Sequence, residues 1–271
     1  MKIAFIGGGN MATALIGGLY GSQSELEKIQ VADPNPDVRQ RLQEQWPLTC
    51  FDHAEQAIAD MDAVVLAVKP QILPAVLEQI GDVLSAEQLL ISIVAGIPIK
   101  QIADQLPSSP AIIRTMPNMP ALIGLGITAL YGDENCSSAQ RDMASKVMCS
   151  VGEVVWLEKE DLMDVVTAVS GSGPAYFFYL VEAMQEAGRG QGLPADIAEK
   201  LALHTANGAC AMALQSDIGV HELRRRVTSR GGTTQAALDQ LQAGQFSELV
   251  DSAIRAATLR GRQLATEGEQ Q

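Results

Sequence analysis

The chain has 271 residues, of which 47% are hydrophobic, and it carries a formal net charge of −13. This length is sufficient for a large buried core and is typical of one or two domains. An acidic protein is repelled by a nucleic-acid backbone and by an anionic membrane, which makes both unlikely ligands. The sequence shows no uninterrupted apolar run of membrane-spanning length and no targeting segment, so we expect a soluble, cytoplasmic protein.

Cysteine and histidine spacing does not indicate a metal centre. The four cysteines form no C-x-x-C pair, and the three histidines are far apart in the sequence. We therefore expect no metal, and we expect reduced structural thiols at Cys50, Cys136, Cys149 and Cys210.

The first element is a short apolar strand, residues 2–6, which runs into a glycine-rich turn and a helix from Asn10 to about Tyr20. Gly7, Gly9 and Ala12 fit the pattern G-x-G-x-x-A. The first glycine permits the tight turn, the second lets a pyrophosphate approach the backbone, and the alanine lets the helix lie close to the strand. The segment therefore predicts a dinucleotide-binding site.

A second strand ends at Asp33. Its carboxylate lies at about the separation from the glycines expected for an acid that binds the ribose of the cofactor. Alternatively, Asp33 is a turn or capping residue ahead of residues 34–36, Pro-Asn-Pro. The sequence leaves both roles open.

Strands and helices then alternate up to about Trp156. Residues 63–68 and 89–96 are apolar runs of the kind found in parallel strands buried on both faces, and residues 111–116 add another strand. Residues 71–84 and 99–106 are long enough for crossover helices. Later strands at 127–131 and 154–156 flank a helix at 137–149. We predict an α/β fold, with a Rossmann-like doubly wound sheet over residues 1–157.

The remainder, residues 158–271, is predicted to be an all-α dimerisation and substrate-binding domain. Helices are expected at 176–187, 194–215, 233–243 and 246–267, because these segments are rich in Ala, Leu, Glu and Gln and contain few breakers. A thin helical layer buries little by itself, which favours a core shared with a second subunit.

Two segments stand out in this second half. Residues 166–177 alternate small and flexible residues up to Pro174, and they are either a hinge with a capped helix or the wall of a cleft. Residues 227–238 place two glycines and two threonines at the start of a helix. That start is either a carboxylate site, built from unpaired N–H groups, or an ordinary N-cap with a threonine at the cap.

Taken together, five segments resemble the pyrroline-5-carboxylate reductase family and occur in its order: residues 5–12, 67–70, 116–118, 168–176 and 227–234. The last two are specific to this family. The resemblance implies reduction of 1-pyrroline-5-carboxylate to L-proline, the last step of proline biosynthesis. It also implies NADPH as cofactor, with NADH possible because of Asp33, and self-association of the helical domain into a dimer or decamer.

The resemblance also implies roles for particular residues. Thr234 is the expected catalytic residue, because the family places a hydroxyl there near the substrate nitrogen. The expected substrate-binding residues are Ser170, Gly171, Ser172, Gly173, Val227, Ser229, Gly231, Gly232, Thr233 and Thr234. The expected cofactor-binding residues are Gly7, Gly8, Gly9, Asn10, Met11, Ala12, Asp33, Ala67, Val68, Lys69, Pro70, Ala95, Gly96, Met116 and Asn118.

The chain departs from the family at three positions. Arg230 replaces the usual Pro, Ala54 replaces an Asn near the adenine ribose, and Asp33 opposes a 2′-phosphate unless Asn35 and Arg39 offset its charge. The chemistry itself requires little more than alignment, since a protonated cyclic imine is already electrophilic at carbon.

Two other functions compete with this interpretation. A hydroxyacid dehydrogenase of the 6-phosphogluconate type needs a lysine base on the helical domain, but only Lys159 and Lys200 follow Glu158, and neither lies in a glycine-rich setting. A non-catalytic NAD(P) sensor needs no second small-molecule site, so the segment 231–234 argues against it.

Overall fold

The computed structural model describes residues 1–22 and 25–267. They form two compact units. Unit 1 is Met1–Ser172 together with the end of the chain from Ala257, and unit 2 is Gly173–Ala256. Within the described part of the chain, no helix combines the length and the apolar character needed to span a membrane.

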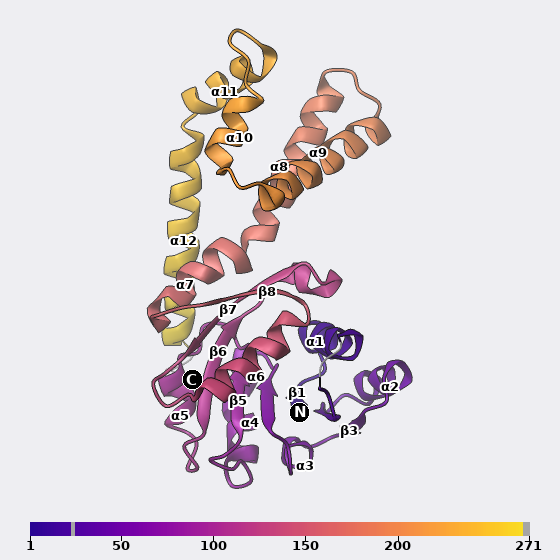
Figure 1. Ribbon diagram of the computed structural model, residues 1–271, viewed down its shortest axis with the longest axis vertical. Coiled ribbons are helices and arrows are strands. Elements are labelled where there is room, and N and C mark those ends of the chain that lie inside the picture. Colours follow the sequence, from indigo (N-terminus) through magenta and orange to yellow (C-terminus); the bar gives the residue numbers. More distant parts are fainter. Residues whose placement is uncertain (23–24, 268–271) are drawn as a thin grey trace. The chain divides into compact units, whose positions relative to one another are not determined.

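Unit 1 is built on an eight-stranded sheet with the order β3-β2-β1-β4-β5-β6-β7-β8 (Figure 1). All neighbouring strands are parallel except β6 and β7. The chain reverses direction across the sheet between β1 and β4, and a doubly wound fold binds its ligand at such a point. The strands are β1 (Lys2–Ile6), β2 (Lys28–Ala32), β3 (Thr49–Phe51), β4 (Ala63–Leu66), β5 (Leu89–Ser92), β6 (Ala111–Met116), β7 (Gly126–Gly132) and β8 (Gly152–Trp156).

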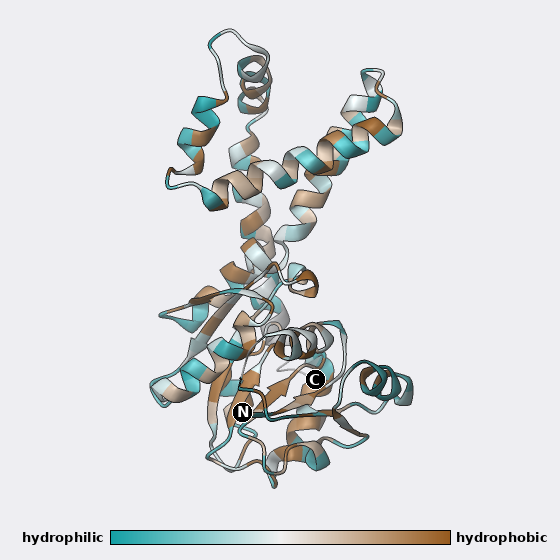
Figure 2. Ribbon diagram, turned by 45° about the vertical axis from the view of Figure 1, so that its right-hand side comes forward, coloured by the Kyte–Doolittle hydropathy of each residue, from teal (hydrophilic) through white to brown (hydrophobic). Residues whose placement is uncertain are grey.

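Helices cover both faces of this sheet and close two hydrophobic cores. Leu15, Ile16 and Leu19 of α1 share one core with Val147 and Met148 of α6. The other core contains side chains of α3, α4 and α5. The central strands are buried on both faces, and they are the most hydrophobic part of the ribbon in Figure 2. The helices are α1 (Asn10–Gly21), α2 (Pro36–Gln45), α3 (Ala54–Ala57), α4 (Leu73–Gly81), α5 (Ile99–Ala103), α6 (Ser138–Cys149) and α7 (Met163–Val166).

Unit 2 is helical and leaves much apolar surface exposed. Its helices are α8 (Gly173–Gly190), α9 (Ala195–Gln215), α10 (Val220–Arg226), α11 (Thr233–Ala243) and most of α12 (Phe246–Glu267). Phe177, Phe178 and Tyr179 are exposed, and Leu214 is 88% exposed. A surface of this kind indicates an interface with another chain.

The predicted α/β sheet and helical second half are confirmed. The expected strands at 63–68 and 89–96 end earlier, at Leu66 and Ser92, and the expected helix 99–106 ends at Ala103. Strand β3 and the helices α2, α3, α7 and α10 were not predicted from the sequence. The turn expected at residues 34–36 is also the start of α2, where Pro36 is the first helical residue and the Asn35 side chain caps the helix by accepting a hydrogen bond from the Asp37 N–H at 2.9 Å.

Candidate functional site

The glycine-rich turn between β1 and α1 has the geometry that its sequence predicts. Gly7 has a φ of +97°, and a Cβ built on it would lie 2.5 Å from the Ala67 carbonyl oxygen. Gly9 is the N-cap of α1, and a Cβ on it would meet nothing within 4 Å. No side chain caps this helix. The first N–H groups of α1 and the open space at Gly9 therefore fit the pyrophosphate of a dinucleotide.

The other predicted cofactor segments follow neighbouring parallel strands. Residues 67–70 follow β4, Ala95 and Gly96 follow β5, and Met116 ends β6. Backbone hydrogen bonds join the carboxyl ends of β1, β4 and β5. The Ala67 N–H donates to the Ile6 carbonyl oxygen at 2.8 Å, and the Ile93 N–H donates to the Leu66 carbonyl oxygen at 3.1 Å. Since parallel strands end at the same edge, the sheet brings these segments together with the glycine turn.

Asp33 directly follows β2, and its carboxylate is tied to the backbone on both sides. One oxygen accepts a hydrogen bond from the Gly8 N–H at 2.8 Å, and the other accepts one from the Asn35 N–H at 2.9 Å. The side chain of Arg39 donates to the Asp33 carbonyl oxygen at 2.7 Å. Asp33 is therefore a turn residue, and its carboxylate also holds the glycine turn.

Asn118 joins two of the family-like segments inside unit 1. Its side-chain nitrogen donates to the Ser170 carbonyl oxygen at 3.3 Å. Ser170 lies in a π-helical turn, Thr167–Gly171, and turns of this type are frequent at functional sites. A Cβ built on Gly171 would lie 2.7 Å from the Met116 Cε, which shows that this turn packs directly against the Met116 side chain. The structure thus brings Met116 and Asn118 together with Ser170 and Gly171.

In unit 2, the loop between α10 and α11 forms a tight turn. Gly231 has a φ of +72°, and the Gly232 N–H donates to the Ser229 carbonyl oxygen at 3.0 Å. A Cβ built on Gly232 would overlap the Ser229 Oγ, so the Ser229 side chain packs directly against this glycine. Val227 is the C-cap of α10 and is exposed.

Capping by a threonine side chain, one of the two interpretations of the start of α11, is wrong. The N-cap is Gly232, and no side chain caps the helix. The hydroxyls of Thr233 and Thr234 make no hydrogen bond to another described residue. The helix therefore offers uncapped N–H groups and two adjacent hydroxyls, which is an arrangement that suits a carboxylate.

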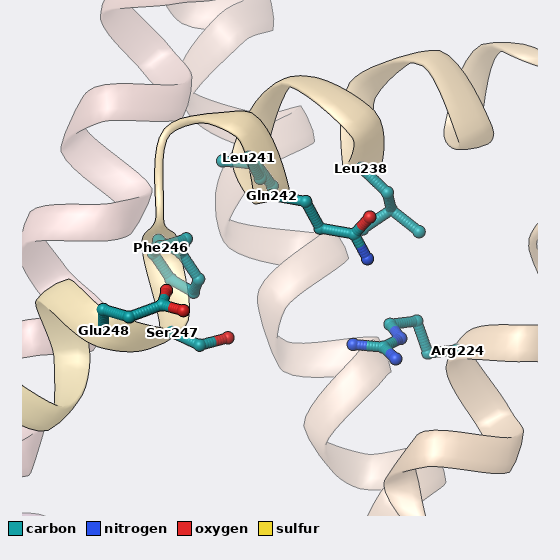
Figure 3. A pocket seen from close by; sticks show the side chains of 7 residues that line it. All are labelled: Arg224, Leu238, Leu241, Gln242, Phe246, Ser247 and Glu248. Carbon is teal, nitrogen blue, oxygen red and sulfur yellow. The ribbon is translucent and has the colours of Figure 1, made fainter.

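Unit 2 also contains a pocket of about 310 Å³ (Figure 3). None of the predicted site residues lines it. Its walls come from α10, α11 and the start of α12, and they comprise Arg224, Leu238, Leu241, Gln242, Phe246, Ser247 and Glu248. On α10 the neighbouring Arg225 and Arg226 donate to Glu222, and these bonds lower the pKa of that carboxyl to about 2.

Sequence reasoning missed Arg41, which lies on α2. Its guanidinium Nη2 donates to the Gly8 carbonyl oxygen at 3.1 Å. This contact was not predicted, because it depends on the packing of α2 and that helix was itself not predicted. Within residues 1–22 and 25–267, no group of three or more His, Cys, Asp and Glu side chains is arranged to hold a metal ion.

Comparison with known proteins finds a separate family model for each half of the chain. Residues 2–96 match the family model described as "NADP oxidoreductase coenzyme F420-dependent", and residues 160–264 match the one described as "Pyrroline-5-carboxylate reductase dimerisation". The fold, the glycine turn and these matches define a nicotinamide-dependent oxidoreductase with a helical dimerisation region.

Full-length relatives narrow this class. The pyrroline-5-carboxylate reductase of Pseudomonas aeruginosa is 44% identical over 264 residues, 97% of each chain. The structure of a pyrroline-5-carboxylate reductase from Coxiella burnetii has a TM-score of 0.93 at 38% identity and covers 97% of this chain and 98% of its own. The crystal structure of Plasmodium falciparum pyrroline carboxylate reductase with NADP bound has a TM-score of 0.85 at 30% identity, with 98% of both chains covered. The chain belongs to the pyrroline-5-carboxylate reductase family, and the resemblance based on motifs is confirmed.

Proposed function

We propose that the protein reduces 1-pyrroline-5-carboxylate to L-proline, the last step of proline biosynthesis, by hydride transfer from a nicotinamide cofactor. The observation that carries this proposal is the sequence identity of 44% to the Pseudomonas aeruginosa reductase over 97% of this chain. The aligned part includes the glycine turn and the loop before α11. Neither a hydroxyacid dehydrogenase nor a non-catalytic sensor has comparable support.

The proposed cofactor site is the carboxyl edge of the sheet in unit 1. The turn Gly7–Ala12 holds the pyrophosphate, and the segments after β4, β5 and β6 border the nicotinamide. A bound nicotinamide supplies the hydride. The protein contributes alignment and exclusion of water, because the hydride must travel directly between two carbon atoms.

The proposed substrate site uses the loop between α10 and α11. The uncapped N–H groups of α11, with Ser229 and Thr233, hold the substrate carboxylate and face residues 170–173 of a second copy of the chain, which form the opposite wall. Thr234 orients the ring nitrogen, because its unoccupied hydroxyl can donate or accept a hydrogen bond as the charge on the imine disappears. Arg230, in the same loop, adds a cationic donor.

We propose NADPH as the preferred cofactor, with NADH also accepted. One argument is the relative from Plasmodium falciparum, which was solved with NADP bound. Another is the Arg39 guanidinium, which donates to the Asp33 carbonyl oxygen at 2.7 Å and so brings a positive charge close to Asp33. This charge partly offsets the repulsion between the Asp33 carboxylate and a 2′-phosphate.

We also propose that residues 1–157 bind the cofactor and that residues 158–271 associate with a second copy, as a dimer or a larger homo-oligomer. The match to a dimerisation family model and the exposed aromatic residues of α8 support this assembly. A cytoplasmic location is part of the same proposal.

The decisive experiment measures oxidation of NADPH and of NADH by the purified protein with 1-pyrroline-5-carboxylate, with detection of L-proline. Proline formation that depends on substrate and enzyme supports the proposal. Oxidation of a hydroxyacid with NADP⁺ but no reduction of the imine overturns it in favour of the dehydrogenase. Cofactor binding without turnover of either substrate overturns it in favour of the sensor.

A further inference from the structure

The peptide groups on either side of Gly8 are held by charged side chains from outside the glycine turn. The Gly8 N–H donates to the Asp33 carboxylate at 2.8 Å. The Gly8 carbonyl oxygen accepts from the Arg41 guanidinium at 3.1 Å and from the Thr13 hydroxyl at 3.4 Å. Hydrogen bonds to an ionised group are stronger than those between neutral groups, so the turn has little freedom to rotate at Gly8.

The orientation of the Gly8 carbonyl determines that of the next N–H group. In a planar trans peptide, the C=O of one residue and the N–H of the following residue point in opposite directions. Arg41 draws the Gly8 carbonyl toward α2, so the Gly9 N–H points away from α2. Gly9 is exposed, a Cβ there would meet nothing within 4 Å, and no described residue accepts a hydrogen bond from its N–H.

Helix α2 is fixed against the turn, which makes the position of Arg41 specific. A Cβ on Gly8 would lie 2.6 Å from the Val38 Cγ1 and 2.9 Å from the Leu42 Cδ1. Leu42 is fully buried. Arg39, two positions before Arg41 on the same helix, instead donates to the carbonyl oxygens of Asp33 and Pro34 at 2.7 and 3.0 Å.

We propose that Arg41 is a positioning residue for the pyrophosphate of the cofactor. It fixes the Gly8–Gly9 peptide so that the Gly9 N–H is presented to the phosphate oxygens. This inference rests on the proposed function only in that the cofactor is a nicotinamide dinucleotide. It differs from a role in recognising the 2′-phosphate, since the arginine acts on the backbone of the turn.

The test measures the dissociation constants of three probes by calorimetry on the full-length protein: ADP-ribose, its 2′-phosphorylated derivative, and adenosine. Only the first two contain the pyrophosphate. In Arg41→Gln we expect both to bind about tenfold more weakly, the loss typical of one charge-assisted hydrogen bond, and adenosine to bind as before. Arg39→Gln is the matched control and should leave the constants of ADP-ribose and adenosine within about twofold, because the Arg39 side chain donates to Asp33 and Pro34 and not to the glycine turn.

Other outcomes overturn the proposal. A loss confined to the 2′-phosphorylated probe makes Arg41 a ligand of the 2′-phosphate. An equal loss for all three probes indicates an adenine contact or a collapsed α2, and thermal unfolding separates these two. Unchanged affinities show that the turn holds its shape without Arg41. Since no imine is present in these measurements, a failure here is distinct from a failure of the wild-type protein to reduce 1-pyrroline-5-carboxylate.

Discussion

Asn118 and Ser170 are 52 positions apart in the sequence, yet the side-chain amide of the first donates to the carbonyl oxygen of the second at 3.3 Å. The other end of the same amide accepts a hydrogen bond from the Ile127 N–H at 3.0 Å. Asn118 is only 9% exposed. One buried side chain therefore joins the segment after β6, which is proposed to border the nicotinamide, to the π-helical turn proposed as a wall of the substrate site.

Removal of this amide should loosen the wall. Asn118→Ala leaves the partly buried Ile127 N–H and Ser170 C=O without their partner, which costs about 1 kcal/mol each. We expect a lower melting temperature and a fall of about tenfold in kcat/KM. Asn118→Asp is the sharper variant, because it keeps the acceptor for Ile127 but places a carboxylate oxygen against the Ser170 oxygen. Wild-type kinetics in both variants would contradict the coupling.

The two outer glycines of the turn should respond differently to valine. Gly9→Val should retain the fold, within about 1 kcal/mol, because φ is −68° and the space is open. Its cofactor affinity should fall more than tenfold, since the side chain takes the space of the pyrophosphate. Gly7→Val should instead lose about 3 kcal/mol of stability, because of its positive φ and the contact with Ala67.

Cofactor titration together with chemical unfolding distinguishes these two variants. Normal cofactor affinity in a folded Gly9→Val protein would remove the glycine turn from the proposed site. A Gly7→Val protein as stable as the wild type would show that the turn can relax around a side chain.

The sequence predicts those parts of the fold that depend on local patterns. Strands β1, β4 and β5 consist mostly of apolar residues, and β6, α11 and α12 were predicted with their observed bounds. Helix α2 was missed because it is strongly polar and starts between two prolines, where a turn has the same signature. Arg41 followed as a second omission, since the contact to Gly8 spans 33 positions and depends on the packing of α2.

The role of the loop before α11 also could not be decided from its local sequence pattern. Two threonines after two glycines fit a threonine cap as well as an anion site, and only the backbone conformation decides between them. The structure places the cap at Gly232, and this leaves both hydroxyls available to a ligand. Asp33 is a related case, because the sequence is compatible with both a ribose ligand and a turn residue. In the structure its carboxylate accepts hydrogen bonds from two backbone N–H groups. A contact between Asp33 and the ribose stays a prediction.

Substitution of Asp33 should change cofactor preference. Asp33→Asn removes the charge but keeps one oxygen acceptor, whereas Asp33→Ser also loses one of the two backbone contacts. We expect both to raise the ratio of kcat/KM for NADPH over NADH, by about three- to tenfold, because a repulsive charge is removed. Asp33→Ser should in addition weaken both cofactors. An unchanged ratio in both variants would show that the carboxylate has no influence on the ribose end.

Cys136 should be the least reactive thiol of the chain. Burial is the main cause that raises its pKa to about 11, and the nearby Asp133 contributes. Because the folded pKa exceeds the unfolded value of 9.0, this thiol stabilises the fold below pH 9, and the contribution is lost as the pH rises toward 11. At pH 8 we expect iodoacetamide to label the exposed Cys149 well before Cys136. Mass spectrometry of the native protein tests this order, which should disappear on unfolding.

Thr234 provides the most direct test of the proposed chemistry, because Thr234→Ala removes one hydroxyl at the start of α11 without adding bulk. The hydroxyl makes no hydrogen bond to another described residue and the N-cap is Gly232, so the helix should be unaffected. Loss of an oriented hydrogen bond to a group whose charge changes typically costs about 10²-fold in turnover. We therefore expect kcat with 1-pyrroline-5-carboxylate to fall by about this factor, while cofactor affinity stays unchanged. Thr233→Ala is the matched control, with the same atoms removed one position earlier, and it should mainly raise KM for the imine. Steady-state kinetics with both substrates varied separates the two effects, and near-normal turnover in Thr234→Ala would leave orientation of the ring nitrogen to the backbone N–H groups of α11.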